Sequence, residues 1–445
     1  MYQSFALKAF RRLFAVTLLL FSCADNIFAS ELTIEEPGQL ALKDDRTLQA
    51  IGANVQELLQ WADAHNPELA ALGYEIDAAN ERIVQAGALP DPTLRVTFMD
   101  IAGPAAPDGF NLWPGDSSRT QYRLGQSFPW RGKRGLRKEV ASAQVEQVKG
   151  LRQATVAEIH ARIKSAYARY YQAVGLIQLN GEILRLLTDL EEVAQVRYAG
   201  GLAAQQDVIR AQVEKTMVIS ELIDLDTERH NAIANLNVAM GRQQSAPIAE
   251  PQSLRRISPE KLDGPALEAR IQRSNPLLAM QSAQVSAADA NRRLAEKNRY
   301  PDVTLMVAPT QYGGSIDSWE AMVEVNIPVR FDSLRAQRSE AAAMLAAASA
   351  SQQAIEIQIA GGLQESLATL QAAARQEQLI ANTLLPQAEL TLNSAQAGYA
   401  TGQVDFSTLL DAQRAVKQAR QDRLRAQAEQ ELRVAEIENM LGEAL

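Results

Sequence analysis

The sequence predicts a mainly α-helical fold with a small β part, arranged as two tandem copies of one helix–strand–strand–helix–helix unit. Only 5% of the 445 residues are aromatic, and Ala, Gln, Leu, Glu and Arg dominate the second half, a composition typical of long helices. No proline interrupts the stretch between Pro129 and Pro247. Short motifs then recur in the same order in both halves, which indicates an internal duplication.

The duplication is marked by four landmarks that each occur once per copy. The matching pairs are Asn66-Pro67 with Asn275-Pro276, Pro90-Asp91-Pro92-Thr93-Leu94 with Pro301-Asp302-Val303-Thr304-Leu305, Tyr198-Ala199-Gly200-Gly201 with Tyr399-Ala400-Thr401-Gly402, and Gly241 with Gly442. We therefore divide the chain into a signal peptide (1–29), an N-terminal extension (30–57), a first copy (58–242), a linker (243–264) and a second copy (265–443).

The N-terminus has the features of an export signal. Basic residues in Lys8–Arg12 precede the apolar run Leu13–Phe21, which is too short to span a bilayer as a helix. Two processing sites compete: cleavage after Ile27-Phe28-Ala29, or a lipoprotein box ending at Cys23, which would then be lipidated. No later run is apolar enough for a transmembrane helix, so an exported chain of this kind is soluble, lipid-anchored or a β-barrel.

Very long helices are the strongest local signal. Apolar residues fall on three/four spacings from about 133 to 197, and a helix of that length would extend roughly 100 Å. Such a helix exceeds an ordinary globular core, so it has to pack along others in a coiled coil or a helical barrel. Its counterpart runs from Ser333 to about Gly398, with a kink expected at Pro386. Glycine-bearing breaks at Tyr198–Asp207 and Tyr399–Ser407 predict the tight turns of two helical hairpins.

Shorter helices and strands precede each long helix. Helices are expected over about 48–88, with a break at Asn66-Pro67, and over about 265–298. Strands follow in which apolar and polar residues alternate. In the first copy Leu94, Val96 and Phe98 share one face, and in the second copy Val303, Leu305 and Val307 do the same. Two turn-rich loops, 102–119 and 311–318, separate the strands of each pair.

The strand lengths leave two interpretations open. Alternation fits a half-buried sheet of a soluble domain, whereas about nine residues is also the length that a tilted strand needs to cross a bilayer. Four strands per chain cannot close a barrel, because the smallest bacterial single-chain barrels have about eight. If the strands lie in a membrane, several chains must share one barrel.

The motifs together resemble the outer-membrane efflux proteins, the trimeric TolC-type channels, over about residues 50–443. The specific segments are Asn66-Pro67-Glu68-Leu69, Leu89-Pro90-Asp91-Pro92, Gln126-Ser127-Phe128-Pro129-Trp130, and Tyr399-Ala400-Thr401-Gly402 followed by Leu409-Leu410-Asp411-Ala412. The resemblance implies long helical hairpins that form a periplasmic α-barrel, and four strands per chain that contribute to a trimeric twelve-strand transmembrane β-barrel.

The resemblance also implies a function and partners. Such a chain is an outer-membrane channel subunit of a tripartite efflux system, a passive exit duct for metal cations or drugs that extends into the periplasm. Its expected partners are two further copies in a homotrimer, a periplasmic adaptor protein, an inner-membrane transporter of the resistance-nodulation-division type, and outer-membrane lipid. Arg131-Gly132-Lys133-Arg134 looks closest to the heavy-metal and cation-efflux branch.

The basic cluster that follows the second strand is a candidate membrane-interface anchor. Trp130, Arg131, Lys133 and Arg134 stand at a helix start, where the helix dipole prefers acids. Lipid headgroups would supply the opposite charge, with Trp130 at the interface. A solvated, charged helix start is the alternative interpretation.

The second hairpin turn carries the candidate gate. By resemblance Asp411 aligns with a gate aspartate and Asp405 lies in the periplasmic constriction, while Thr408 replaces the usual neighbouring acid. Three chains would set these carboxylates in rings that favour cations, although an acid near a helix N-terminus is an ordinary feature.

The hairpin tips are candidate contacts for the adaptor. By resemblance Tyr198, Gly200, Gly201, Tyr399 and Gly402 meet it there, while the glycines also serve backbone geometry.

Other functional classes have less support. No catalytic constellation, cofactor motif or metal site emerges, so an enzyme is not expected, and the net charge of -9 argues against nucleic-acid binding. A periplasmic adaptor would show one hairpin between glycine-rich strand domains, and a coiled-coil scaffold of the envelope would not need duplicated strand pairs.

Overall fold

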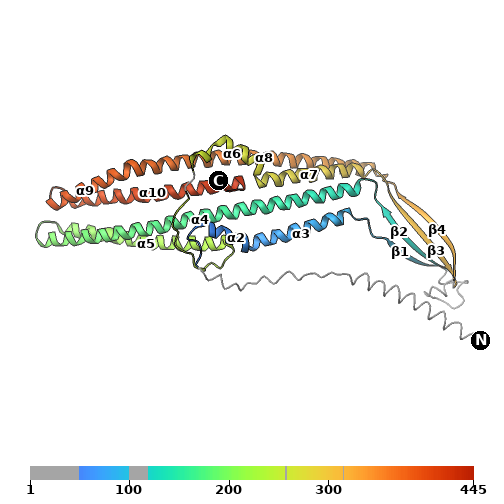
Figure 1. Cartoon of the computed structure of the whole chain (residues 1–445), viewed down its shortest axis with the longest axis horizontal. Coiled ribbons are helices and arrows are strands. Elements are labelled where there is room, and N and C mark those ends of the chain that lie inside the picture. Colours follow the sequence, from blue (N-terminus) through green and yellow to red (C-terminus); the bar gives the residue numbers. More distant parts are fainter. Residues whose placement is uncertain (1–49, 100–118, 256–257, 314) are drawn as a thin grey trace, which may run out of the picture. The chain divides into compact units, whose positions relative to one another are not determined.

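The two predicted copies run through the same order of elements in the computed structural model of this protein (Figure 1). The structure describes residues 50–99, 119–255, 258–313 and 315–445. The predicted signal peptide, Cys23, the first part of the N-terminal extension and nearly all of the loop 102–119 lie outside these ranges.

Each copy contains two shorter helices, two strands and a long helical hairpin. The first copy comprises α2 (Val55–His65), α3 (Pro67–Gly87), β1 (Thr93–Met99), β2 (Arg119–Phe128), α4 (Lys133–Ala199) and α5 (Gln205–Met240). The second comprises α6 (Gly264–Ser274), α7 (Pro276–Lys297), β3 (Asp302–Tyr312), β4 (Ser315–Asn326), α8 (Phe331–Leu379), a π-helical turn (Ile380–Leu384), α9 (Leu385–Thr401) and α10 (Phe406–Leu441). The short 3-10 helix η2 (Pro259–Leu262) lies in the linker.

The Asn-Pro motif joins the two ends of each copy. Asn66 caps α3 by accepting a hydrogen bond from the amide of Glu68, while its Nδ2 donates to the carbonyl of Ala239 at 3.0 Å. Asn275 repeats the arrangement, with its Nδ2 2.6 Å from the carbonyl oxygen of Met440. The helix break that proline imposes therefore also fixes the start of one helix to the end of another, more than 160 residues later in the chain.

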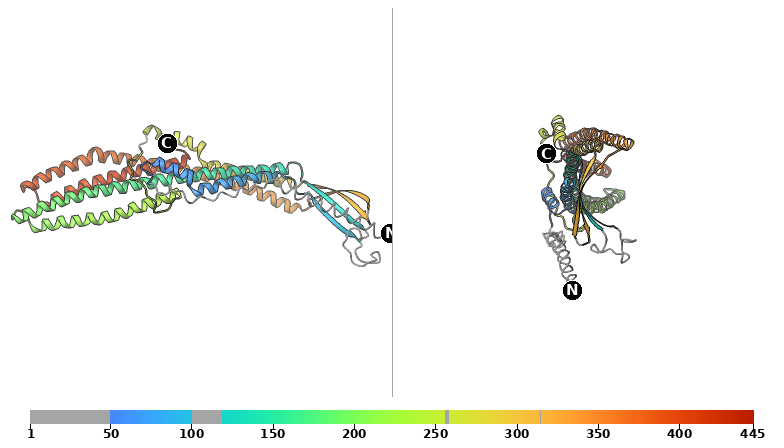
Figure 2. Two further views of the ribbon diagram at one scale, coloured as in Figure 1. Left: turned by 60° about the horizontal axis from the view of Figure 1, so that its bottom comes forward. Right: turned by 90° about the vertical axis from the view of Figure 1, so that its right-hand side faces the viewer.

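The four strands form one antiparallel sheet in the order β1-β2-β3-β4, and α4 and α8 begin beside the end of the sheet that faces the helices (Figures 1 and 2). The register sets Leu94 opposite Leu124, which in turn faces Val307, so the apolar face continues across both copies. Many apolar side chains of this face are exposed in the single chain, among them Leu94, Leu124, Leu305, Val307, Val323 and Val325. The face therefore requires an apolar environment outside this subunit.

The loop between the strands of the second copy is shorter than predicted. Pairing continues to Tyr312 and Ser315, after a register shift at Thr310/Gln311. The predicted loop 311–318 is therefore wrong in its extent. Glycine and serine in that segment indicated a loop, but a tight turn at Gly313, with φ of +54°, satisfies them.

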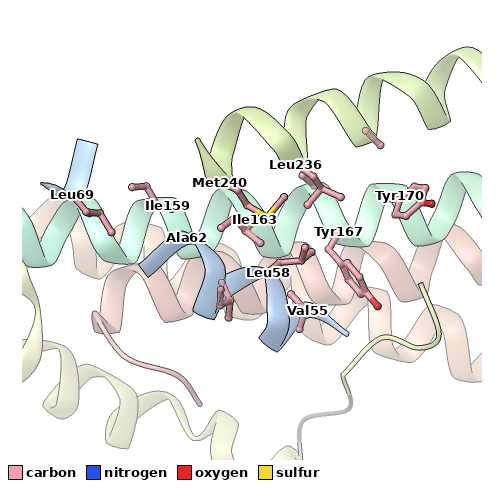
Figure 3. Packing of buried hydrophobic residues seen from close by; sticks show 13 residues of the cluster. Val55, Leu58, Ala62, Leu69, Ile159, Ile163, Tyr167, Tyr170, Leu236 and Met240 are labelled. Atoms are coloured by element: carbon pink, nitrogen blue, oxygen red, sulfur yellow. The ribbon is translucent and has the colours of Figure 1, made fainter. Parts of the chain in front are cut away.

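The long helices pack side by side around hydrophobic clusters, two of which include the first hairpin. One cluster unites α2 with α4 and α5, and includes the fully buried Leu58, Ile163, Leu236 and Met240 (Figure 3). A second cluster near the hairpin tips joins α4 and α5 to α9 and α10 through residues such as Leu187 and Phe406. The two hairpins of one chain are thus packed together near their tips.

The expected interruption of the second long helix is confirmed, and it takes the form of a π-helical turn that ends two residues before Pro386. Proline lacks the amide that would bond one turn back, and widening the preceding turn is one way to accommodate it. Among the described residues, none of the helices is long and apolar enough to serve as a membrane span.

Candidate gate and hairpin-tip network

The two hairpin tips are tied together by Arg197, at the end of α4. Its guanidinium donates to the carbonyl oxygens of Tyr399 and Ala400 at 2.9 and 3.1 Å, and lies 4.8 Å from the centre of the Tyr399 ring. Tyr399 is buried and packs against Phe406, whereas Tyr198 at the matching position of the first copy is 47% exposed. The two tip tyrosines, which the repeat made equivalent, therefore have different surroundings.

The tip glycines have the backbone geometry that the sequence suggested for two of them. Gly201 and Gly402 have φ of +69° and +75°, in the left-handed region that suits glycine, while Gly200 ends α4 with a negative φ. Among the described residues, a Cβ added at Gly201 would meet no atom within 4 Å, so the space beside this glycine is open.

Asp405 is the N-cap of α10. One carboxylate oxygen accepts hydrogen bonds from the amide and the hydroxyl of Thr408, at 3.0 and 2.6 Å, and the other accepts one from Ser407. The hydroxyl of Thr408, its amide and the hydroxyl of Ser407 hold the pKa of Asp405 at about 2. The ordinary interpretation of this acid as a helix-start residue is therefore correct at the level of one chain.

The pKa of Asp405 predicts how the cap responds to substitution and to pH. Asp405→Ala should speed amide hydrogen exchange at the start of α10, whereas Asp405→Asn should change it little, because asparagine also caps helices. Because the folded pKa is depressed, the contribution of the carboxylate is complete above its unfolded value near 3.8 and is lost as pH falls through about 2. Hydrogen exchange measured from pH 2 to 7 tests this, and equal protection in wild type and Asp405→Ala would contradict it.

Asp411 belongs to an ion-pair chain that reaches the first hairpin. Its carboxylate lies 3.2 Å from Arg414, and Arg414 also binds Glu214 of α5 in a bidentate contact, with distances of 3.1 and 2.6 Å. Glu214 is almost fully buried, while the Asp411 side chain is 71% exposed. Arg414 thus couples an exposed acid on one hairpin to a buried acid on the other.

Glu221, seven residues after Glu214 on α5, forms a second link between the two hairpins. It accepts from Lys417, from Nε2 of Gln421 at 2.6 Å, and weakly from Asn180. Burial opposes its ionisation, but the bonds from Lys417 and Gln421 outweigh burial and lower its pKa. Sequence reasoning missed this site, although the heptad spacing of Glu214 and Glu221 is a signal of charged positions beside a helical interface.

The predicted interface anchor divides into two kinds of residue. Trp130 is 38% exposed and stacks on Tyr300 at 5.1 Å, and Arg131 is also exposed. Arg134 is exposed as well, and its guanidinium donates to the carbonyl oxygen of Gly87, the last residue of α3. A cation beside a helix C-terminus is stabilised by that helix's dipole, so α3 supplies part of the opposite charge that this cluster lacked in the sequence.

Lys133 is not the surface anchor that the sequence suggested. Its side chain is only 5% exposed, and Nζ bonds to Asp302 at 2.8 Å and to the carbonyl oxygen of Tyr300 at 3.0 Å. The amide of Trp130 donates to the same Asp302 oxygen. Because a buried ammonium requires a partner, Lys133 turns inward and joins the start of α4 to the start of β3.

A buried charge cluster, which the sequence did not reveal, connects the linker to both hairpins. Arg255 binds Glu431 and Glu438 at 2.6 and 2.9 Å, and Glu438 also receives Lys164 at 2.8 Å. Burial raises the pKa of Glu431; burial also opposes ionisation of Glu438, but bonds from Arg255 and Lys164 lower its pKa. Two cations and two acids therefore neutralise one another, and the seven-residue spacing of the acids on α10 was the available signal.

The residues that the structure describes contain no cluster of metal-binding side chains. There, no group of three or more His, Cys, Asp or Glu residues could hold a metal ion. His160 pairs with Asp63 at 2.7 Å, and His65 stacks on Trp61. These two histidines have structural contacts within the chain.

Comparisons with known proteins find a sequence relative and solved structures of the same fold. The Cobalt-zinc-cadmium resistance protein CzcC of Cupriavidus metallidurans is 24% identical over 372 residues, covering 82% of this chain and 84% of the relative. The outer membrane protein VceC of Vibrio cholerae superposes with a TM-score of 0.74 at 18% identity, over 88% of this chain and 96% of that one. The MtrE outer membrane channel of Neisseria gonorrhoeae, in its open state, gives 0.70 at 16% identity, over 88% and 89%.

The family match covers both copies. Residues 58–242 and 269–443 match the outer membrane efflux protein family. The predicted fold class, mainly helical with long hairpins and four strands, is confirmed, as are the outer-membrane location with a periplasmic extension and the function as a passive efflux channel rather than an enzyme. The chain belongs to the outer membrane efflux protein family.

Proposed function

We propose that three copies of this chain share one twelve-strand barrel and a periplasmic helical barrel, which form the exit duct of a tripartite metal-efflux system. The observation that carries the proposal is the sheet, which has two open edges and an exposed apolar face. An open edge in lipid leaves backbone groups unpaired, and closure by further copies removes it. The name of the CzcC relative supports divalent cobalt, zinc or cadmium ions as the cargo.

The proposed partners meet the duct at its two ends. Trp130, Arg131 and Arg134 would lie at the lipid headgroups beside the end of the sheet that faces the helices. The open tips at Tyr198, Gly200, Gly201 and Gly402 would contact a periplasmic adaptor, which couples the duct to a transporter of the resistance-nodulation-division type. Tyr399 would support this contact from beneath, because it is buried.

The hairpin tips would also close the duct. In this proposal Asp411 faces the constriction with its two symmetry copies, and Arg414 holds it to Glu214 of the first hairpin. Asp405 and Thr408 would shape the constriction by fixing the start of α10, since their contacts are those of a cap. Rings of carboxylates at one level favour cations.

The test combines assembly with conductance. Outer-membrane fractions should yield a heat-sensitive trimer, and a monomer in the soluble periplasm would overturn the proposal. In planar bilayers, Asp411→Ala and Arg414→Ala should raise single-channel conductance, because each removes part of the link between the hairpins. Asp422→Ala is the matched control, since Asp422 pairs with Arg425 on the same helix. Equal conductance in all variants would remove Asp411 from the gate.

A further inference from the structure

The two edge strands of the sheet carry opposite charge on the polar face. On β1 this face presents Thr93, Arg95, Thr97 and Met99, and on β4 it presents Ser318, Glu320, Met322, Glu324 and Asn326. The only charge on this face of β1 is positive, and both charges on this face of β4 are negative. If identical chains close one barrel, as the proposed function requires, β4 of one copy lies beside β1 of the next.

Arg95 has an unfavourable neighbour within its own chain. The register sets it directly opposite Arg123, and like charges at such a position destabilise a sheet. Arg123 is satisfied in part by Gln121, whose amide in turn donates to Glu320 at 3.1 Å. In the described residues neither Arg95 nor Glu324 makes an ion pair, and both are exposed. Among the described residues, the β1 edge therefore presents Arg95 without a counterion, and the β4 edge presents Glu324 in the same state, while Glu320 bonds only to the neutral Gln121 amide.

The helix-facing ends of the strands indicate how far neighbouring copies are staggered. The line of paired residues through Thr93 passes Gly125 and Met306 and reaches Met322, whereas β4 continues to Asn326 before the chain returns toward α8. Thr93 and Asn326 are the last paired residues at the helical end, so crossing three strand steps displaces the line by four residues. A fourth step, to the next copy, brings the displacement to about five or six residues.

Only an even displacement keeps the polar face inside the barrel. A displacement of six sets Thr97 of the next copy opposite Glu324, so that Arg95 reaches Glu324 along the diagonal. A displacement of four sets Arg95 directly opposite Glu324. The corresponding strand tilts are about 45° and about 35°, both within the usual range for barrels. Arg95 and Glu324 come within reach of each other in either register.

We infer that Arg95 of one subunit and Glu324 of its neighbour form an ion pair on the pore side of each subunit junction. This pair gives the junction its polarity, because a β1 edge would meet a second β1 edge with two arginines and no acid. Three such pairs would close the sheet in one rotational sense.

Charge reversal tests the pair in the full-length membrane protein. Arg95→Glu and Glu324→Arg should each lower the temperature at which the trimer dissociates on detergent gels by about 5 °C. The double variant Arg95→Glu/Glu324→Arg should recover most of this shift. Arg95→Glu/Glu320→Arg is the matched control, since Glu320 lies on the same face of β4 but two pleat repeats from Glu324, and it bonds to Gln121. Recovery by the control but not by the Glu324 pair would overturn the inference.

Disulfide trapping gives an independent readout. The chain has one cysteine, Cys23, which is removed or lipidated in the expected mature protein. Thr97→Cys/Glu324→Cys or Arg95→Cys/Glu324→Cys should yield oxidised dimers and trimers, whereas Thr93→Cys/Ser318→Cys should not. An intact trimer with no cross-link from either pair would refute the Arg95–Glu324 junction, while a wild-type chain that is monomeric would contradict the proposed function instead.

Discussion

Replacing Arg255 with alanine should lower the free energy of unfolding by about 3–5 kcal/mol, because it leaves two buried acids without their common cation. The side chains of Glu431 and Glu438 are only 5% and 3% exposed, and they repel each other once the guanidinium is absent. Lys164 would still pair with Glu438, so Glu431 would bear most of the loss. Chemical denaturation of the purified protein, followed by circular dichroism, measures the effect.

Three further variants identify the cause. Arg270→Ala removes an arginine whose ion pair with Glu443 is exposed. It should therefore lower the free energy of unfolding by no more than about 1 kcal/mol. Arg255→Lys keeps the charge but not the two-pronged contact, and should fall between wild type and Arg255→Ala. Arg255→Met/Glu431→Leu removes an acid together with its cation, and should recover much of the stability. If Arg255→Ala costs no more than Arg270→Ala, the cluster is not a determinant of stability.

Replacing Gly442 with alanine should lower the free energy of unfolding by about 2–5 kcal/mol. Gly442 has φ of +74°, a conformation that costs a residue with a side chain about 1–2 kcal/mol. A Cβ there would also lie 2.6 Å from Cδ of Pro276 and 3.2 Å from the carbonyl oxygen of Ser274, and such overpacking typically costs about 1–3 kcal/mol more. Thermal unfolding and the yield of trimer measure the loss.

The duplication supplies a replicate and a control for this prediction. Gly241→Ala should behave alike, because its Cβ would lie 2.6 Å from Cδ of Pro67. Gly201 has a similar φ of +69°, but a Cβ added there would meet no atom within 4 Å. Gly201→Ala should therefore lower the free energy of unfolding only by the backbone contribution of about 1–2 kcal/mol. Equal destabilisation at Gly442 and Gly201 would show that contact with proline is unimportant.

Much of the fold could be predicted because its signals are local. The α4 helix was expected over 133–197 and spans Lys133–Ala199, since periodicity and the absence of proline specify a helix without reference to its neighbours. The Asn66-Pro67 break was expected for the same reason. The extent of β3 and β4 was underestimated, because a turn at Gly313 needs fewer residues than its composition suggested.

The candidate site was less accessible to sequence reasoning. Asp405 was placed correctly at a helix start, and the Asp-x-x-Thr spacing already contained the cap. Lys133 was misplaced, because sequence position cannot say whether a long side chain turns toward solvent or toward Asp302. Tyr198 and Tyr399 were treated as equals, although packing by Phe406 and Arg197 buries only the second.

Local patterns in the amino-acid sequence are enough to predict two copies of one unit, with long hairpins, two strand pairs and glycines that end each copy. These features depend on neighbours a few residues apart. The pairing of distant charges is visible only in the folded chain, where Arg255 meets acids 176 and 183 residues away and Arg414 meets Glu214. Periodicity specifies the face that a side chain occupies, whereas its partner depends on the lengthwise position of packed helices and, for Arg255, on the path of the linker across them.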